Sequence, residues 1–200
     1  GTLSLPERSI EDISNRRVKY LTEYQNREYA KRYSNFVEMV RLVEHEKIND
    51  SCELSSAVAK SLFKLMAYKD EYEVARLYTS GEFETKLHAQ FEGQFKLRFY
   101  LAPPFLSSRN SVTGEVKKRE FGPWIFWVFK YLAKLKWLRG TMFDVFSYTS
   151  ERKMERQLID VYQTTIREVL VNLNTSNYSL AVEIANLPQE IRGFGHVKER

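Results

Sequence analysis

The chain has 200 residues, of which 43% are hydrophobic and 14% aromatic, with a formal net charge of +5. This apolar content is ample for one core, so we expect a single domain over residues 1–200. Segments of roughly 20 apolar residues and a secretory signal pattern are both absent, and the lone Cys52 excludes an intrachain disulfide. We therefore expect a cytoplasmic protein without a membrane partner.

The first half of the chain is predicted to be helical. A segment from Ile10 to about Glu46 contains neither Gly nor Pro, which favours a long helix. Its apolar stripe shifts phase near Asn26, so either the helix bends there or its second half packs on a different partner. Further helices are predicted over Leu54–Tyr68, over Tyr72–Thr79 with Gly81 as a stop, and over Phe83–Phe91.

A β-ribbon is predicted around residues 94–121. The apolar residues Phe95, Leu97, Phe99 and Leu101 alternate with Lys96, Arg98 and Tyr100. This alternation is typical of a strand with one buried face. Pro103 and Pro104 end this strand, and residues 116–121 can return as a second one. The expected fold class is therefore all-α with a small β-ribbon insertion.

Three further helices are predicted after the ribbon. Pro123 suits the first turn of a helix over Trp124–Arg139. Two adjacent apolar stripes predict a broadly buried helix over Ser150–Asn172. The last predicted helix, Thr175–Leu187, is closed by Pro188.

The aromatic helix over Trp124–Arg139 has two interpretations. Aromatic and aliphatic residues fill its first turns and lysines follow, which resembles an interfacial membrane helix. Such a helix keeps one polar face throughout, whereas here apolar residues lie all round the first two turns. We favour a central buried helix that emerges into solvent at its far end, with an exposed aromatic remnant if a partner domain is absent.

Positive charge is concentrated between Glu115 and Gly140. Seven basic residues, among them Lys117, Lys118 and Arg119, stand against two acidic ones there, which equals the surplus of the whole chain. Such a patch can attract nucleic acid, an anionic membrane, an acidic protein surface or a phosphorylated ligand. The alternative is a solvated face.

Two groups of residues that could support chemistry have simpler explanations. Glu84, His88 and Glu92 have the i, i+4, i+8 spacing of metal ligands, but charged surface helices produce such triads readily, and we expect no bound metal. The acidic run Asp70, Glu71 and Glu73 is expected to be a solvated first helical turn rather than an acid–base pair.

The tyrosines and histidines can likewise be interpreted either as structural residues or as binding or catalytic ones. The tyrosines at positions 20, 24, 29 and 33 are expected to pack in the core rather than to stack on nucleic-acid bases. His45, which lies among charged residues, is expected on the surface. His196 lies between glycines with Arg192 and Lys198 nearby, so a general base, an anion contact or a domain contact are all conceivable. We favour packing, because no nucleophile or metal site accompanies it.

Several segments carry a family resemblance. They are Tyr24–Tyr33, Leu62–Tyr78, the stretch Tyr72–Trp124, Leu138–Asp144 and Arg192–Lys198. Together they resemble the helical domain of uncharacterised function at the C-terminal end of single-chain indolepyruvate ferredoxin oxidoreductases, a branch of the 2-oxoacid:ferredoxin oxidoreductases. The resemblance covers nearly the whole chain. The absence of an initiator Met also leads us to expect a C-terminal fragment of a larger oxidoreductase.

The resemblance implies a parent enzyme that decarboxylates aryl 2-oxoacids oxidatively to acyl-CoA and reduces ferredoxin. Such a parent uses thiamine diphosphate with Mg²⁺, iron–sulfur clusters and coenzyme A. This chain has one cysteine where a four-iron cluster needs four, no Gly-Asp-Gly segment for thiamine diphosphate, and no phosphate-cradling glycine loop. We therefore expect no cofactor in the fragment and no catalysis by it alone.

The function hypothesis is a non-catalytic assembly and interface domain whose partners are the other domains of the parent, with ferredoxin as a further candidate. Arg119–Trp124 and Arg192–Lys198 are expected to lie close together and form the contact surface. The candidate contact residues are Lys117, Lys118, Arg119, Phe121, Trp124, Arg192, Phe194, His196 and Lys198. In the alternative, basic residues contribute to a coenzyme A or ferredoxin site of the parent. A third hypothesis, a nucleic-acid-binding helical domain, lacks a supporting motif.

Overall fold

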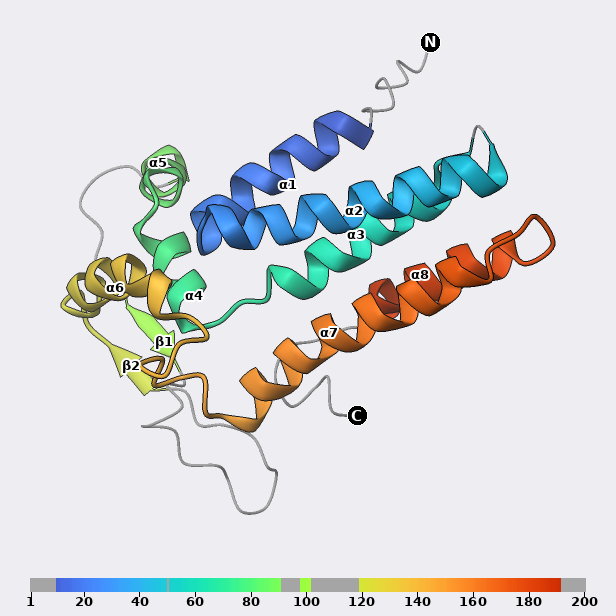
Figure 1. Cartoon of the computed structure of the whole chain (residues 1–200). Coiled ribbons are helices and arrows are strands. Elements are labelled where there is room, and N and C mark those ends of the chain that lie inside the picture. The colour runs from blue at the N-terminus through green and yellow to red at the C-terminus, as the bar shows by residue number, and fades with distance from the viewer. Residues whose placement is uncertain (1–9, 50, 91–97, 102–118, 192–200) are drawn as a thin grey trace, which may run out of the picture. The chain divides into compact units, whose positions relative to one another are not determined.

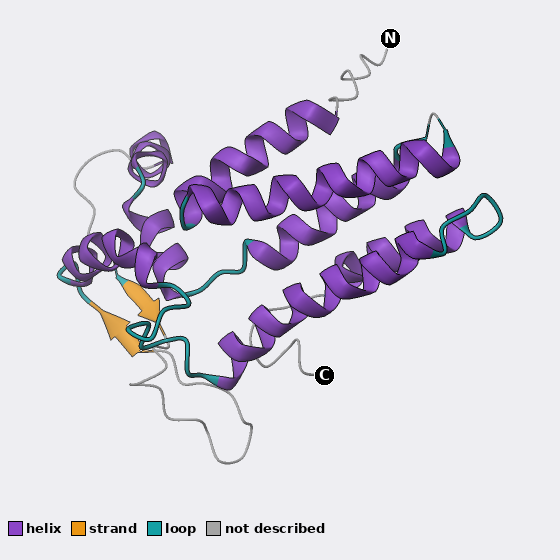
Figure 2. Cartoon of the chain, viewed as in Figure 1, coloured by secondary structure: helices purple, strands orange, loops and turns teal. Residues whose placement is uncertain are grey.

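The computed structural model describes residues 10–49, 51–90, 98–101 and 119–191 (Figure 1). Figure 2 shows that helices dominate these residues and that one two-stranded antiparallel ribbon accompanies them, which confirms the predicted fold class. The elements are α1 (Ile10–Tyr24), α2 (Arg27–Ile48), α3 (Glu53–Met66), α4 (Glu71–Thr79), α5 (Gly81–Gln90), β1 (Phe99–Leu101), β2 (Arg119–Phe121), α6 (Ile125–Lys134), the 3₁₀ helix η1 (Leu135–Leu138), α7 (Ser150–Val171) and α8 (Tyr178–Glu190).

The chain divides into two compact units. The first comprises Gly1–Tyr68 and Tyr148–Arg200, and the second comprises Lys69–Ser147. Each unit is built around its own cluster of buried apolar side chains. The single domain expected from chain length stays a prediction, because two compact units can belong to one folding domain.

The long helix predicted from Ile10 is interrupted at Asn26. Asn26 has an extended backbone, and its side chain accepts a hydrogen bond from the Tyr29 amide at 2.8 Å, which is the geometry of an N-cap. The chain therefore starts a new helix there, and α1 and α2 pack against each other. The phase shift in the apolar stripe correctly located this change, but it marks the end of one helix rather than a bend.

Helix α3 is the centre of the first unit, because it packs against α1, α2, α7 and α8. It is buried on several sides, through large side chains such as Leu54 and Leu62 and small ones such as Ala57. Helix α8 contributes buried Ala181 and Ala185 to the same cluster. Small residues let helix axes approach closely, so the pair α3 and α8 forms a tight contact.

Buried tyrosines in this unit donate their hydroxyl groups to backbone carbonyls. Tyr24 donates to the carbonyl of Tyr68 at 2.9 Å, and Tyr33 donates to that of Ala59 at 3.1 Å. Neither side chain is exposed. The predicted core packing is confirmed for Tyr24 and Tyr33, whose hydrogen bonds satisfy their polar ends. Tyr20 and Tyr29 are partly buried against the same cluster.

Two helix termini of the first unit are capped by side chains from other helices. The carboxylate of Glu44, on α2, accepts the amide hydrogens of Leu54 and Ser55 at 2.8 and 2.9 Å, and so caps the first turn of α3. Lys64 donates to the carbonyls of Gln189 and Ile191, both at 2.9 Å, at the end of α8. These contacts fix the start of α3 to α2 and the end of α8 to α3.

Helix α8 does not end where the sequence predicted. Pro188 is buried inside its last turn, and the helix continues to Glu190. A proline costs most in a helix interior, where it removes a backbone hydrogen bond. Near the end of α8, Lys64 supplies donors to the carbonyls of the last residues, which supports the additional turn.

The second unit has a small aromatic core. The ribbon pairs Phe99 with Phe121, and Phe99 packs with Ala75 of α4 and with Ile125 and Phe129 of α6. Tyr78 stacks on Phe129 with ring centroids 5.6 Å apart. Helix α4 ends at Thr79 as predicted, and Gly81, expected as its stop, is also the first residue of α5. The ribbon prediction is confirmed for residues 99–101 and 119–121, and the remainder of the predicted strands lies outside the described residues.

Across the described ranges, none of the helices combines the length and the apolar character that crossing a bilayer requires.

Candidate docking surface on the second unit

A buried ion pair anchors the second unit. The Arg139 guanidinium donates from Nε to Asp70 Oδ2 at 2.5 Å and from Nη2 to Asp70 Oδ1 at 2.8 Å. Both side chains are 3% exposed. Asp70 also caps α4, since Oδ1 accepts the Glu73 amide hydrogen at 2.8 Å. The pair therefore ties the chain that follows η1 to the start of α4.

Asp144 holds the same chain segment from a second point. It accepts hydrogen bonds from the Tyr72 hydroxyl at 3.0 Å, from the Gly140 amide at 2.8 Å and from the Phe146 amide at 3.2 Å. Burial and the neighbouring Asp144 carboxylate raise the pKa of Tyr72. Gly140 turns the chain here with a φ of 77°. We name residues 139–146 the anchored loop. Its conformation is held by the hydrogen bonds of Asp70 and Asp144.

The acidic residues at the start of α4 are not the solvated turn that the sequence predicted. Asp70 and Glu73 are both buried. Glu73 receives two hydrogen bonds from Arg76, both at 2.8 Å, and Asp70 pairs with Arg139. Because each buried carboxylate faces a guanidinium, its charge is compensated inside the unit, and these groups are poorly suited to exchange protons with a substrate.

The anchored loop presents apolar side chains to solvent. Met142 and Phe143 are 77% and 69% exposed, and Val145 is also exposed, although Asp144 between them is buried. Internal hydrogen bonds therefore fix the loop, while Met142, Phe143 and Val145 stay exposed to solvent. Such an arrangement is typical of a protein contact surface.

Helix α6 has two apolar faces. Ile125 and Phe129 are buried in the aromatic core. The opposite face, which we name the aromatic stripe, is exposed, with Trp127 at 66%. The stripe consists of Trp124, Trp127, Val128, Tyr131 and Leu135.

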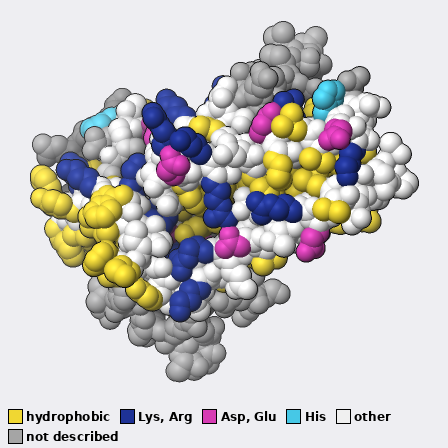
Figure 3. Space-filling model, viewed as in Figure 1, with side chains coloured by type: hydrophobic (Ala, Val, Ile, Leu, Met, Phe, Trp, Pro, Cys, Tyr) yellow, Lys and Arg dark blue, Asp and Glu magenta, His cyan; other side chains and the backbone are white. Residues whose placement is uncertain are grey.

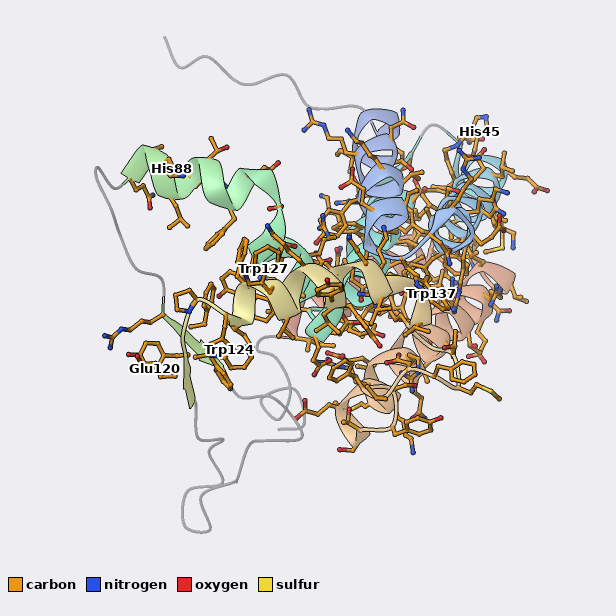
Figure 4. The ribbon with its side chains drawn as sticks, turned by 90° about the vertical axis from the view of Figure 1, so that its left-hand side faces the viewer. His45, His88, Glu120, Trp124, Trp127 and Trp137 are labelled. Atoms are coloured by element: carbon orange, nitrogen blue, oxygen red, sulfur yellow. The ribbon has the colours of Figure 1, made fainter. Side chains whose placement is uncertain are left out.

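Figure 4 shows Trp124 and Trp127 at one end of α6 and Trp137 beyond the other end. Hydrophobic side chains also gather on the face shown in Figure 3, where Figure 1 draws α6. The predicted burial of this helix therefore holds for one face only, and the other face is an exposed aromatic surface, which we expected if a partner domain is absent. A sequence that is apolar all round does not reveal which face will find a partner within the chain.

Lysines lie along one edge of the aromatic stripe. The Lys130 ammonium lies 5.0 Å from the Phe126 ring centroid and 5.1 Å from that of Trp127, within the range of a cation–π contact. Lys134 follows one turn later and is exposed. Within the described part of the chain, neither lysine has an acidic partner, and no acidic residue occurs between Phe121 and Phe143.

The structure places only part of the predicted contact surface. Arg119 pairs with Leu101 in the ribbon, Phe121 is half-buried beside the aromatic core, and Trp124 is exposed with its ring 5.9 Å from that of Phe121. The remaining predicted contact residues, Lys117, Lys118, Arg192, Phe194, His196 and Lys198, lie outside the described residues. Proximity of the two motifs, and every role considered for His196, therefore stay predictions.

The other two histidines lie on the surface. His45 on α2 is exposed, as predicted, and His88 on α5 is exposed as well (Figure 4). Glu92 and the side chain of Glu84 are outside the described residues. Among the residues that are described, no group of three or more His, Cys, Asp or Glu side chains is arranged to hold a metal ion.

Sequence reasoning missed the parts of the surface that depend on long-range contacts. Arg139 was predicted as the end of the aromatic helix and as part of the basic segment, and Asp144 only as part of the family resemblance. Nothing in their spacing indicates that Asp70 and Tyr72 are their partners. One local signal was available, because an Asp directly before a helical pattern is a common N-cap. It would have indicated that Asp70 is a helix cap rather than part of a solvated turn.

Comparison with known families matches the chain over residues 10–200 to a family described as "Family of unknown function (DUF6537)". Neither the comparison with curated proteins nor that with solved structures finds a match.

Proposed function

The chain belongs to the DUF6537 family, and we propose that it is a non-catalytic assembly and interface domain of a cytoplasmic 2-oxoacid:ferredoxin oxidoreductase. The parent enzyme converts aryl 2-oxoacids such as indolepyruvate to acyl-CoA, with thiamine diphosphate and iron–sulfur clusters bound outside this chain. The assignment to that enzyme class rests on the resemblance of segments such as Leu62–Tyr78 and Leu138–Asp144.

One observation carries the interface role, namely the aromatic stripe of α6. In the described part of the second unit, the buried apolar cluster consists of Ala75, Phe99, Ile125 and Phe129, whereas the stripe and the anchored loop leave more and larger apolar side chains exposed. Burial of apolar surface stabilises a protein by about 25 cal/mol per Å². A unit that leaves so much of this surface open gains stability from a partner that covers it.

The anchored loop supports the same role. Its ion pair between Arg139 and Asp70 requires desolvation of two charges, and the result is a loop that displays Met142 and Phe143. Preorganised contact residues bind more tightly, because less conformational entropy is lost on association. Trp and Tyr, which dominate the stripe, are the residues most enriched at energetically important interface positions.

The test is direct association with the rest of the parent enzyme, produced as a separate polypeptide and measured by calorimetry. We expect a stable complex, and we expect Trp127→Ala combined with Tyr131→Ala to weaken it by tenfold or more, on the order of two interface hot spots. Leu42→Ala is the matched control, since Leu42 is an exposed apolar residue of the first unit. No complex at micromolar concentrations, or equal effects of both changes, would contradict the proposal.

A further inference from the structure

The charge beside the aromatic stripe indicates what kind of partner covers it. We propose that the stripe binds an amphipathic helix of a partner polypeptide whose apolar ridge is flanked on one side by Asp or Glu. This inference rests on the proposed function, because it identifies the chemistry of the partner at the same surface.

The spacing of the stripe favours a helical partner. Trp124, Trp127, Val128, Tyr131 and Leu135 follow one another at intervals of three, one, three and four residues. Trp127, Val128 and Tyr131 lie on one side of α6, Trp124 directly precedes this helix, and Leu135 begins η1. A ridge of this kind packs into the groove of a second helix, as in helix pairs and helix-in-groove complexes.

The lysines specify acidic groups on that partner. Lys130 and Lys134 are one turn apart on the same edge of the stripe, and neither has an acidic partner among the described residues. The contact of Lys130 with the Phe126 and Trp127 rings holds its ammonium beside the stripe. A carboxylate on the covering helix would pair with these ammonium groups. A helix with basic residues at the same positions would instead be repelled by the two lysines.

Other occupants fit these observations less well. A second copy that packs its own aromatic stripe on this one brings no acid to the lysines, since none occurs between Phe121 and Phe143. Single-stranded nucleic acid needs cations that follow its phosphates together with rings for its bases, whereas here aliphatic Val128 and Leu135 share the stripe.

A charge-exchange experiment with the full chain tests the inference. Two synthetic helical peptides share one Leu and Ala ridge, and one carries Glu along its flank while the other carries Lys. Calorimetry measures their binding to the wild-type chain, to K130E/K134E and to the control K60E/K153E, which makes the same charge change at exposed lysines of the first unit. Circular dichroism of each variant verifies that the helices are retained.

We expect the wild type to bind the Glu peptide about tenfold more tightly than the Lys peptide. Lys130 and Lys134 form two exposed ion pairs with the Glu peptide and are repelled by the lysines of the other peptide. K130E/K134E should reverse this preference, the control should keep it, and Trp127→Ala should weaken both peptides. The inference is overturned if neither peptide binds, if the preference is absent or survives the charge exchange, or if phosphatidylglycerol-containing vesicles or oligo(dT) bind in place of the peptides.

The outcomes separate this inference from the proposed function. If the peptides show the charge preference but the remainder of the parent enzyme does not bind the chain, the assignment to that enzyme fails and the stripe still has an acidic helical partner. If the remainder binds but K130E/K134E leaves its affinity unchanged, the interface role stands and the acidic helix is wrong.

Discussion

Arg139 and Asp70, which are 69 positions apart in the chain, form a two-point ion pair in the interior of the second unit. Asp70 at the same time caps α4. One carboxylate thus orients a helix and holds the anchored loop that displays Met142 and Phe143. The stability of the unit and the shape of its exposed surface therefore depend on the same residue.

Asp70→Asn should destabilise the chain by about 3–5 kcal/mol, because it leaves the Arg139 charge buried without a counter-charge. The free energy of unfolding from urea titration measures this. Lys31→Gln is the control, since it breaks the exposed pair between Lys31 and Glu28, which has side chains 57% and 78% exposed, and should change stability by less than about 1 kcal/mol. Equal effects of the two changes would contradict the role of the buried pair.

Gly140 and Gly81 offer a matched pair of backbone tests. A Cβ at either position meets no atom within 4 Å, but only Gly140 has a positive φ. Gly140→Ala should therefore cost about 1–2 kcal/mol through backbone strain alone, whereas Gly81→Ala, in α5, should be neutral or stabilise by up to about 1 kcal/mol. Thermal melting of both variants provides the comparison, and a loss at Gly81 as large as at Gly140 would show that strain at φ 77° is not the cause.

Glu44→Ala should destabilise the first unit by about 3 kcal/mol. The Glu44 carboxylate accepts hydrogen bonds from the Leu54 amide, the Ser55 amide and the Tyr178 hydroxyl. Its loss leaves the Ser55 amide without this acceptor and the Leu54 amide with only the Tyr178 hydroxyl at 3.2 Å. Tyr178→Phe should cost only about 1 kcal/mol, since both amides keep their partner. Chemical denaturation that shows equal losses would mean that Glu44 acts mainly through Tyr178.

The two faces of α6 should respond differently to truncation. Phe129→Ala removes a buried ring from the aromatic core and should cost about 3–5 kcal/mol. Trp127→Ala removes an exposed ring and should change the free energy of unfolding of the isolated chain by less than about 0.5 kcal/mol. Urea titrations of the two variants decide the matter. A large loss from Trp127→Ala would assign the stripe to the stability of the chain itself.

Alkaline pH should destabilise the chain through its buried tyrosines. Burial raises the pKa of Tyr33, Tyr72, Tyr162 and Tyr178 above the usual value of about 10. Above that pH the unfolded chain releases protons that the folded chain retains, so the stability present below pH 10 is lost as pH rises toward the folded-state pKa values.

The measurement is the thermal midpoint between about pH 9 and pH 11, the range around the ordinary tyrosine pKa. Tyr162→Phe removes the hydroxyl that donates to the Ala185 carbonyl at 2.9 Å, so its midpoint should fall less steeply with pH than that of the wild type. An identical slope in both proteins would show that Tyr162 does not titrate differently in the two states.

Local signals in the sequence were sufficient for the elements and the fold class. Alternation around Phe99 predicted the ribbon, and the absence of Gly and Pro after Ile10 predicted helix. Errors occurred where a contact from a distant residue changed the outcome. Lys64 accompanies the extension of α8 past Pro188, and the Arg139 guanidinium holds Asp70 in the interior.

The sequence by itself determined that this chain is mainly helical and where most helices run, because backbone hydrogen bonds and side-chain periodicity act over a few residues. Only the tertiary structure decided which apolar face of α6 is buried with Phe129 and which is left exposed with Trp127. It alone joined Arg139 to Asp70. Both outcomes depend on packing between segments that are far apart in the chain, and the free energy of such contacts is not encoded in any local pattern.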